Sequence, residues 1–163
     1  PSTKVRLSEH KTKIKTNFYF YCRMKFRTFA KKHGVMKRHY NVVCAVIRDG
    51  EKYLCTQRLR SHRKYESELW EFPGGKVKEG ENDYEALIRE IKEEMDWDVY
   101  VGQKLGTVEH EYPDFTITLT AFLCKGGDAD FKLFNHLDAK WLTIDKMQNL
   151  RWTEADRKLL TLL

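Results

Sequence analysis

The sequence predicts an α+β fold in which a mixed β-sheet is sandwiched between helices. Apolar, strand-like runs and segments with helical periodicity alternate over residues 36–163, and no linker or repeat interrupts them. Strands come first and helices lie between and after them, so helices are available to cover the faces of the sheet. A chain of 163 residues buries enough surface to fold without disulfides or a structural metal.

Five strands are expected, over residues 42–47, 52–57, 100–111, 115–124 and 139–142. The first two are joined at Asp49-Gly50, a dipeptide typical of tight hairpins. The third and fourth are joined at Pro113-Asp114. In the fourth strand Phe115, Ile117 and Leu119 alternate with threonines, as in an antiparallel strand with one buried face.

Three helices are expected, over about residues 82–95, after Thr143 and after Thr153. Threonine is a favourable N-cap, which suits it to the start of the last two helices. The apolar residues of the first helix form one face that must pack on the sheet; they are Tyr84, Leu87, Ile88, Ile91 and Met95.

The positive charge of the chain lies in its first 35 residues. Residues 1–35 contain 10 basic residues and 1 acidic residue, a net charge of +9, whereas residues 36–163 contain 20 basic and 23 acidic residues, a net charge of −3. We expect residues 1–35 to be a basic extension, poorly ordered or upstream of a natural start at Met36, and residues 36–163 to be one domain. The alternatives are a tail that contacts nucleic acid or a membrane, and a targeting peptide.

The four cysteines, Cys22, Cys44, Cys55 and Cys124, form no C-x-x-C pair, and no His pair accompanies them at zinc-site spacing. Cys44 and Cys55 lie in strand-like apolar runs, so we expect buried thiols in a reducing, cytoplasmic protein without a redox site. No apolar run reaches the ~18 residues of a membrane span, so no membrane partner is expected.

Three glutamates lie on one stripe of the helix expected at residues 82–95. At about 100° per residue, Glu90, Glu93 and Glu94 fall within about 100° of one another, beside the apolar face. Carboxylates this close repel, more so where they are partly desolvated. A divalent cation would remove that repulsion, and oxygen ligands suit Mg²⁺ or Mn²⁺. The alternative is a solvated helix surface.

Residues around these glutamates fit the same metal site. Gly74-Gly75 allows a tight backbone turn and leaves a carbonyl free to approach a metal. Arg89 can hold a neighbouring carboxylate in one orientation. Glu81 lies just before the helix, where it can cap the helix or contact Arg89.

The joint pattern resembles the Nudix box, G-x5-E-x7-R-E-U-x-E-E-x-G-U, where U is apolar. The matching residues are Gly75, Glu81, Arg89, Glu90, Ile91, Glu93, Glu94 and Trp97. Asp96 stands where the box has its second glycine. That position typically follows the helix end in a left-handed conformation, which Asp tolerates better than most residues.

The resemblance implies the Nudix fold and a hydrolase that cleaves a nucleoside diphosphate linked to another group. It implies that Mg²⁺ or Mn²⁺ is held by Glu90, Glu93, Glu94 and the Gly75 carbonyl, with Arg89 among the catalytic residues and Glu81 in a supporting role. One of the glutamates would orient or deprotonate the attacking water, and which of them does so stays open.

The likeness extends over roughly residues 39–163, and Thr56-Gln57-Arg58, the segment 69–75 and Ala155-Asp156 resemble the MutT branch, particularly its CTP pyrophosphohydrolase group. In that frame Arg58 contacts phosphate, Phe72 lines the base pocket, and Asp156 reads the base edge. An alternative stays open for each residue. Arg58 could be a surface arginine, and Phe72 could be a core residue. Asp156 has capping-box spacing from Thr153, so it could serve only to satisfy the start of the helix.

One departure concerns the loop before the last strand. MutT-like enzymes often place a further glutamate six residues ahead of a tryptophan, but the residue six before Trp141 is Asn135. Asn can bind a metal weakly and cannot act as a base. His136 could serve instead, although we expect a lone loop histidine to be solvated.

The sequence therefore predicts a metal-dependent nucleoside triphosphate pyrophosphohydrolase. A small-molecule nucleotide is its expected partner, and CTP or an oxidised or modified nucleotide is favoured. One alternative is a Nudix hydrolase of a nucleotide sugar or dinucleoside polyphosphate. Another is a non-catalytic, nucleic-acid-binding Nudix-like module, which is disfavoured because every box glutamate is present. No oligomeric state is predicted.

Overall fold

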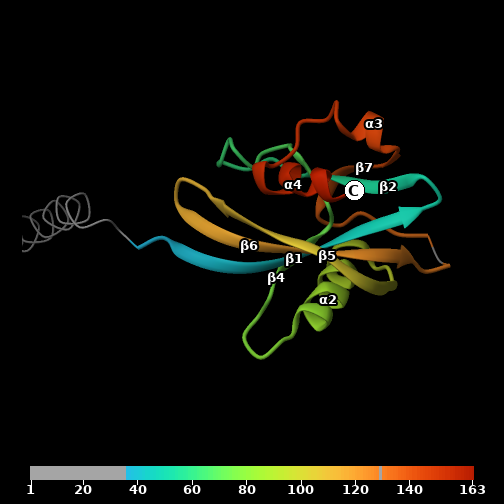
Figure 1. Cartoon of the computed structure of the whole chain (residues 1–163), viewed down its shortest axis with the longest axis horizontal. Coiled ribbons are helices and arrows are strands. Elements are labelled where there is room, and N and C mark those ends of the chain that lie inside the picture. The colour runs from blue at the N-terminus through green and yellow to red at the C-terminus, as the bar shows by residue number, and fades with distance from the viewer. Residues whose placement is uncertain (1–35, 129) are drawn as a thin grey trace, which may run out of the picture. The chain divides into compact units, whose positions relative to one another are not determined.

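The computed structural model describes residues 36–128 and 130–163 (Figure 1). Its strands are β1 (Arg38–Asp49), β2 (Lys52–Arg58), β3 (Trp70–Glu71), β4 (Gly74–Lys76), β5 (Val99–Glu111), β6 (Phe115–Gly126) and β7 (His136–Leu142). Its helices are α2 (Asp83–Met95), α3 (Ile144–Met147) and α4 (Glu154–Leu159), followed by the 3₁₀ turn η1 (Leu160–Leu162). The expected basic extension and Cys22 lie outside the described residues.

The strands form a mixed sheet with the order β3-β2-β1-β6-β5, in which β4 also pairs with β1 and β7 with β2. β1 runs parallel to β6 and antiparallel to β2 and β4. The expected hairpins, β1–β2 and β5–β6, are both antiparallel. Helix α2 lies on one side of the central strands and α4 on the other (Figure 1). The predicted α+β sandwich is confirmed.

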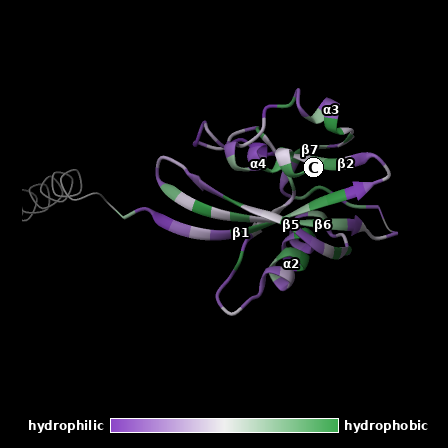
Figure 2. Cartoon of the chain, in the orientation of Figure 1, coloured by the Kyte–Doolittle hydropathy of each residue, from purple (hydrophilic) through white to green (hydrophobic). Residues whose placement is uncertain are grey.

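Residues of β1 alternate between two hydrophobic cores, one on each face of the sheet. Val43, Ala45 and Ile47 pack with residues of α2, whereas Cys44 and Val46 pack with residues around α4. Figure 2 shows the apolar segments in the central strands and on α2. A strand buried on both faces has few polar positions, which is why residues 42–47 form a continuous apolar run.

The buried face of α2 is narrower than the sequence predicted. Its buried residues are Ala86, Leu87, Ile91 and Met95. Tyr84 and Ile88, expected on the same face, are 48% and 49% exposed. Tyr84 still packs on the sheet, with its ring centroid 4.9 Å from that of Phe122, but both residues lie at the margin of the apolar stripe and are half exposed, so that expectation is corrected.

Pairing in the sheet lengthens two strands and creates two that the sequence did not predict. β1 begins at Arg38 because residues 38–41 pair with residues 115–118 of β6. β7 begins at His136 because its polar first residues pair with β2. β3 and β4 have two and three residues, and they are ordered only through pairing with β2 and β1. Runs this short carry no periodicity to detect.

Both ends of α2 are held by side chains. Asn82 caps the helix, because its Oδ1 accepts from the N–H groups of Tyr84 and Glu85 at 3.0 Å, and Glu85 bonds back to the Asn82 N–H. At the other end Asp96 is left-handed, with φ of 47°, as predicted from the box. Lys132 Nζ lies 2.9 Å from its carboxylate. The helix therefore presents its glutamates in a fixed register.

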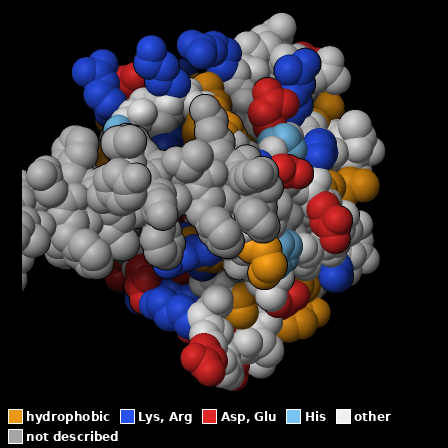
Figure 3. Space-filling model, turned by 90° about the vertical axis from the view of Figure 1, so that its left-hand side faces the viewer, with side chains coloured by type: hydrophobic (Ala, Val, Ile, Leu, Met, Phe, Trp, Pro, Cys, Tyr) orange, Lys and Arg blue, Asp and Glu red, His pale blue; other side chains and the backbone are white. Residues whose placement is uncertain are grey.

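The described cysteines, Cys44, Cys55 and Cys124, are buried and free, as expected. Within the part of the chain that the structure describes, no helix is long and apolar enough to cross a membrane. On the face shown in Figure 3, Lys and Arg side chains lie among Asp and Glu side chains. That mixture agrees with the near balance of charge over residues 36–163.

Candidate active site

A pocket of about 440 Å³ lies where β1, β4 and α2 meet the loop that follows β2. Its ionisable and amide lining comes from Arg58, Arg60, Arg63, Glu66, Glu71, Lys76, Glu90, Glu94, Asn135 and Asp156, and its aromatic lining from Tyr40, Phe72, Tyr112 and Phe115. The lining combines acidic and basic groups with aromatic rings, so the pocket can hold a charged group together with a planar ring.

Two glycines bring the backbone of β4 close to its neighbours. Gly74 has φ of +153°, and a Cβ there would lie 2.2 Å from the Val43 carbonyl oxygen. A Cβ on Gly75 would lie 2.4 Å from the carboxyl carbon of Glu90. Only glycine permits both approaches. The backbone at Gly75 and the Glu90 carboxylate therefore face one small volume.

Arg89 is the centre of an ion-pair cluster. Its Nε and Nη2 donate to the two oxygens of Glu81 at 2.5 and 2.8 Å. Its Nη1 donates to Glu90 Oε1 at 2.7 Å and to Glu93 Oε2 at 3.2 Å. Hydrogen bonds from Arg89 and from the Lys78 N–H lower the pKa of Glu81 to about 2. The predicted contact between Glu81 and Arg89 is confirmed, and Arg89 fixes the orientation of Glu90.

Glu94 lies deeper and lacks such a partner. Its side chain is 16% exposed, and its Oε2 has no hydrogen-bond partner among the described residues. Burial raises the pKa of Glu94 to about 7, and the charges of Glu71 and Glu90 add to this effect against the influence of His136. A buried carboxylate oxygen without a donor costs free energy unless a ligand satisfies it.

Asp156 faces the aromatic side of the pocket from the first turn of α4. Its Oδ1 accepts from the Phe72 N–H at 3.0 Å, and its Oδ2 accepts from the Thr153 hydroxyl at 2.5 Å. Burial raises the pKa of Asp156 to about 7, and the charge of Glu71 raises it further. The Thr153 N–H instead donates to the Trp70 carbonyl at 2.9 Å. The Thr153 hydroxyl does accept from the Asp156 N–H at 3.3 Å and caps α4, so one half of the capping box kept as an alternative for Asp156 is formed and the reciprocal half is not.

Phe72 satisfies both of the descriptions that the sequence left open. It is 2% exposed and belongs to the core, with its ring centroid 5.0 Å from that of Trp152. It also lines the pocket. Its backbone N–H holds Asp156, so the ring and the carboxylate are fixed relative to each other.

Arg58 lies on the pocket wall, where its Nη1 makes a short ion pair with Glu71 Oε2. Its Nε is buried and has no hydrogen-bond partner among the described residues. The sequence did not assign a role to Glu71. The signal was present, because Glu71 is a charged residue between two buried aromatic residues, Trp70 and Phe72.

The predicted stripe of three glutamates divides in the structure. Glu90 and Glu94 line the pocket, whereas Glu93 lies on its rim, 51% exposed and 3.4 Å from Lys78 Nζ. Asn135 lines the pocket. His136 is buried, with 2% of its side chain exposed, so the expectation of a solvated histidine is wrong. Its pairing with β2 carries it into the interior.

The residues fit a hard divalent cation. Within the described residues no three His, Cys, Asp or Glu side chains already converge as a complete metal site. Glu90 and Glu94 nevertheless open on the same pocket as Gly75, and Glu94 has an unsatisfied buried oxygen. Oxygen donors of this kind suit Mg²⁺ or Mn²⁺.

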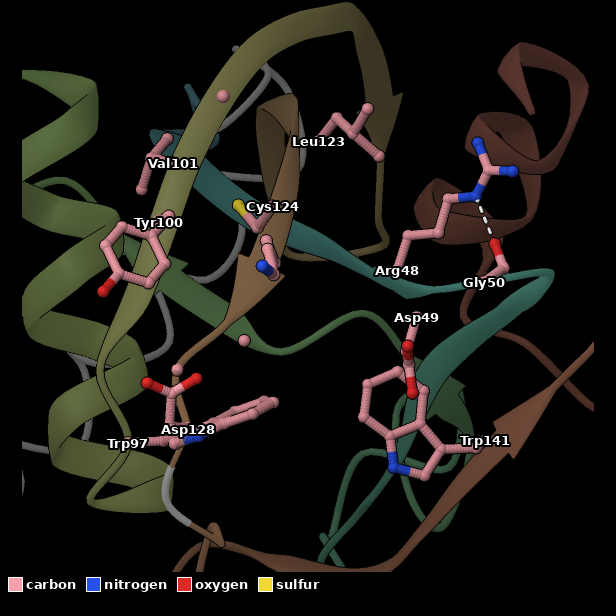
Figure 4. A pocket seen from close by; sticks show the side chains of 14 residues that line it. Arg48, Asp49, Gly50, Trp97, Tyr100, Val101, Leu123, Cys124, Asp128 and Trp141 are labelled. Atoms are coloured by element: carbon pink, nitrogen blue, oxygen red, sulfur yellow. Dashed lines mark hydrogen bonds between the residues drawn. The ribbon is translucent and has the colours of Figure 1, made fainter.

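A second, larger hollow of about 730 Å³ lies between the start of β5, the end of β6 and the β1–β2 hairpin (Figure 4). Trp97, Tyr100 and Trp141 line it, together with Arg48 and Asp128. Its charged groups stand apart from one another in Figure 4. We place the active site in the smaller pocket, because that pocket holds converging carboxylates and both groups with a pKa raised to about 7.

A family model described as the NUDIX domain matches residues 37–163. The chain belongs to the Nudix family. This Nudix hydrolase is 38% identical over 89 residues to the 8-oxo-dGTP diphosphatase of Proteus vulgaris, covering 53% of this chain and 77% of the relative. It is 30% identical over 120 residues to the CTP pyrophosphohydrolase of Escherichia coli K12, and the match covers 73% of this chain and 87% of that relative.

Solved structures agree with this assignment. The Nudix hydrolase MutT of methicillin-resistant Staphylococcus aureus 252 superimposes with a TM-score of 0.62 at 41% identity, over 77% of this chain and 95% of that chain. The E. coli ORF135 protein superimposes with a TM-score of 0.66 at 28% identity, over 77% and 89%. The resemblance to the MutT branch of the Nudix family is therefore confirmed.

Proposed function

We propose that this Nudix hydrolase is a metal-dependent nucleoside triphosphate pyrophosphohydrolase that releases a nucleoside monophosphate and pyrophosphate. The observation that carries the proposal is the pocket, in which the buried Glu94 carboxylate and Glu90 adjoin an aromatic compartment that contains Phe72 and Asp156. A triphosphate and its base need these two environments side by side.

We propose that Glu90, Glu94 and the Gly75 carbonyl hold Mg²⁺ or Mn²⁺, and that Glu93 contributes from the rim. When bound, such an ion neutralises phosphate oxygens and lowers the pKa of a water molecule. Arg89 keeps Glu90 in position through the 2.7 Å bond. A box glutamate accepts the proton of the attacking water.

We assign the binding of the phosphates and of the base to residues on the pocket wall. Arg58 binds phosphate, because it lines the pocket and has a buried Nε without a partner in the described chain. Phe72 packs against the base, and Asp156 accepts a hydrogen bond from an exocyclic amine such as N4 of cytosine. The names of the two relatives, which cite CTP and 8-oxo-dGTP, support this substrate class.

A nucleotide panel tests the proposal. The purified full chain would be incubated with Mg²⁺ and canonical, oxidised and methylated NTPs and dNTPs, with nucleotide sugars and dinucleoside polyphosphates alongside. We expect pyrophosphate and the monophosphate from at least one triphosphate. Orthophosphate as the main product would contradict the proposed bond, and cleavage of nucleotide sugars alone would contradict the substrate class.

A further inference from the structure

We infer that His136 is a positioning residue that braces two carboxylates of the pocket, Glu94 and Glu71, through a single ring nitrogen. The inference rests on the proposed function, because it assigns His136 a part in holding the groups that would bind metal and phosphate. Nothing in the box pattern points to His136, which lies 42 residues after Glu94 in the chain.

The contacts form a continuous chain across the pocket. His136 Nε2 lies 3.4 Å from Glu71 Oε1 and 3.9 Å from Glu94 Oε2. The other oxygen of Glu71 is ion-paired with Arg58. One imidazole therefore lies between the carboxylate offered to metal and the carboxylate that anchors the phosphate-binding arginine.

The backbone fixes His136 from two sides. In the β2–β7 pairing His136 is opposite Arg58, next to an irregularity at Gln57, and in the β2–β3 pairing Glu71 is opposite Thr56. Thr56 and Arg58 are two residues apart, so their side chains share one face of the sheet with those of their partners. The three functional side chains thus come from three adjacent strands.

The segment before His136 is tied to the helix that carries Glu94. The Phe134 N–H donates to the Glu94 carbonyl at 3.0 Å, and the Lys132 N–H donates to the Met95 carbonyl at 2.9 Å. A displacement of β7 would therefore displace the end of α2. This double attachment is what a brace needs, because the imidazole keeps its place when ligands come and go.

The physical role of the ring is to separate and orient like charges. Glu71 and Glu94 are both largely buried, with side chains 13% and 16% exposed. With its proton on Nε2 the imidazole points its N–H at Glu71 Oε1, 3.4 Å away, and the positive end of that N–H dipole also lies near Glu94 Oε2, at 3.9 Å, without a hydrogen bond. The dipole offsets the repulsion between the two carboxylates. Groups behind a metal ligand commonly change metal affinity or activity 10–100-fold when they are removed. Without the ring, we expect Glu71 to lose one of its two restraints and Glu94 to lose the N–H dipole beside it.

Three variants of the full chain test the inference. His136→Leu keeps most of the volume and removes the donor, whereas His136→Gln offers an amide nitrogen near the position of Nε2. The exposed His62→Gln is the matched control. The readouts are the dissociation constant for Mn²⁺ alone, kcat and KM for the best triphosphate of the panel, and thermal unfolding in EDTA.

We expect His136→Leu to weaken Mn²⁺ binding about 10-fold and to lower kcat more than it raises KM. His136→Gln should recover most of the Mn²⁺ affinity and most of kcat, and His62→Gln should match the wild type in both. If His136→Leu unfolds in EDTA, a folded His136→Asn variant decides, because its amide nitrogen reaches only the position of Nδ1. It must then weaken Mn²⁺ binding while His136→Gln does not.

The outcomes separate this inference from the proposed function. Normal Mn²⁺ affinity and kcat in a folded His136→Leu protein would overturn the brace while hydrolysis by the wild type upholds the function. If the wild type binds Mn²⁺ more tightly than His136→Leu but cleaves no triphosphate, the function is overturned and the brace is upheld. A wild type that does not bind Mn²⁺ would overturn both.

Discussion

The two sides of the acidic cluster carry their charge in opposite ways. Around Arg89, the outer Glu81 and Glu93 and the pocket-lining Glu90 share one guanidinium, and the pKa of Glu81 is about 2. On the pocket side Glu94 and Asp156 are buried, and the pKa of each is about 7. The same kind of side chain is thus stabilised as an anion in one region and destabilised as an anion in the other.

The difference separates charge that already has a partner from charge that has none. Arg89 sets the geometry of the box by holding Glu90 at the pocket, and its partners are partly compensated before any metal binds. The buried carboxylates on the pocket side lower the stability of the metal-free protein, and the unpartnered Glu94 oxygen is one that a bound cation can satisfy. Each prediction below would break or sharpen this division.

Replacing Glu94 should separate activity from stability most strongly. We expect Glu94→Gln to lower kcat with Mg²⁺ by about 10²–10⁴-fold, because the loss of a positioned base or ligand has effects of this size. The same change should raise the melting temperature in EDTA at pH 8, since it removes a buried uncompensated charge. Steady-state kinetics and thermal unfolding measure the two effects.

Glu93→Gln is the matched comparison for Glu94→Gln. Glu93 lies on the rim and is half exposed, so we expect a smaller loss of kcat, about 10-fold, and no gain in melting temperature. Equal losses and equal stability in the two variants would erase the distinction between rim and pocket.

Removing the shared guanidinium should damage both properties together. Arg89→Met leaves Glu81 and Glu90 without their principal partner, so we expect a lower melting temperature and a loss of activity of about 10–100-fold. Lys78→Met, which breaks only the 3.4 Å pair with Glu93, is the control. An Arg89→Met protein as active and stable as Lys78→Met would show that the cluster does not set the geometry of Glu90.

A methyl group at Gly75 should test the approach of backbone to carboxylate. Gly75→Ala would place its Cβ 2.4 Å from the Glu90 carboxyl carbon, so Glu90 has to move, and we expect kcat to fall about 10-fold. Gly80→Ala has φ of +85° and no neighbour within 4 Å. It should cost about 1 kcal/mol in backbone strain and leave kcat unchanged, and an equal loss of kcat would argue against the close contact.

The pH dependence of stability tests the pocket side of the division without any ligand. The folded-state pKa of Asp156, about 7, lies above its ordinary value of 3.8. The folded protein therefore binds more protons than the unfolded chain between these values, and stability falls as pH rises from about 4 to 7. Asp156→Asn keeps an acceptor for the Phe72 N–H and should flatten this fall by up to about 4 kcal/mol. Parallel curves of unfolding free energy against pH for the wild type and Asp156→Asn, both measured in EDTA, would contradict this prediction.

The sequence predicted the fold and the outer side of the site better than the pocket. The box spacing located Arg89 and its glutamates because all lie within one helix and the turn before it, where geometry follows from residue number. The apolar runs located the long strands in the same way. Local periodicity sufficed for both.

Glu71 was not singled out and His136 was expected to be solvated, because the positions of both depend on pairing between distant segments. Glu71 lies in a two-residue strand, and His136 becomes interior only when β7 pairs with β2. The division of the glutamate stripe has the same cause, since Lys78 and the pocket wall decide which carboxylate is exposed. Helical periodicity placed all three glutamates on one stripe and could not order them by depth.

The most direct test of the division between partnered and unpartnered carboxylates is the change in melting temperature caused by Mg²⁺ at pH 8. A ligand that binds only the folded state stabilises it in proportion to its affinity and concentration. The wild type should gain several degrees on addition of Mg²⁺, and Glu94→Gln should gain little while melting higher in EDTA. An equal Mg²⁺ shift in both proteins would contradict the account, because the buried carboxylate would then not be the group reserved for the metal.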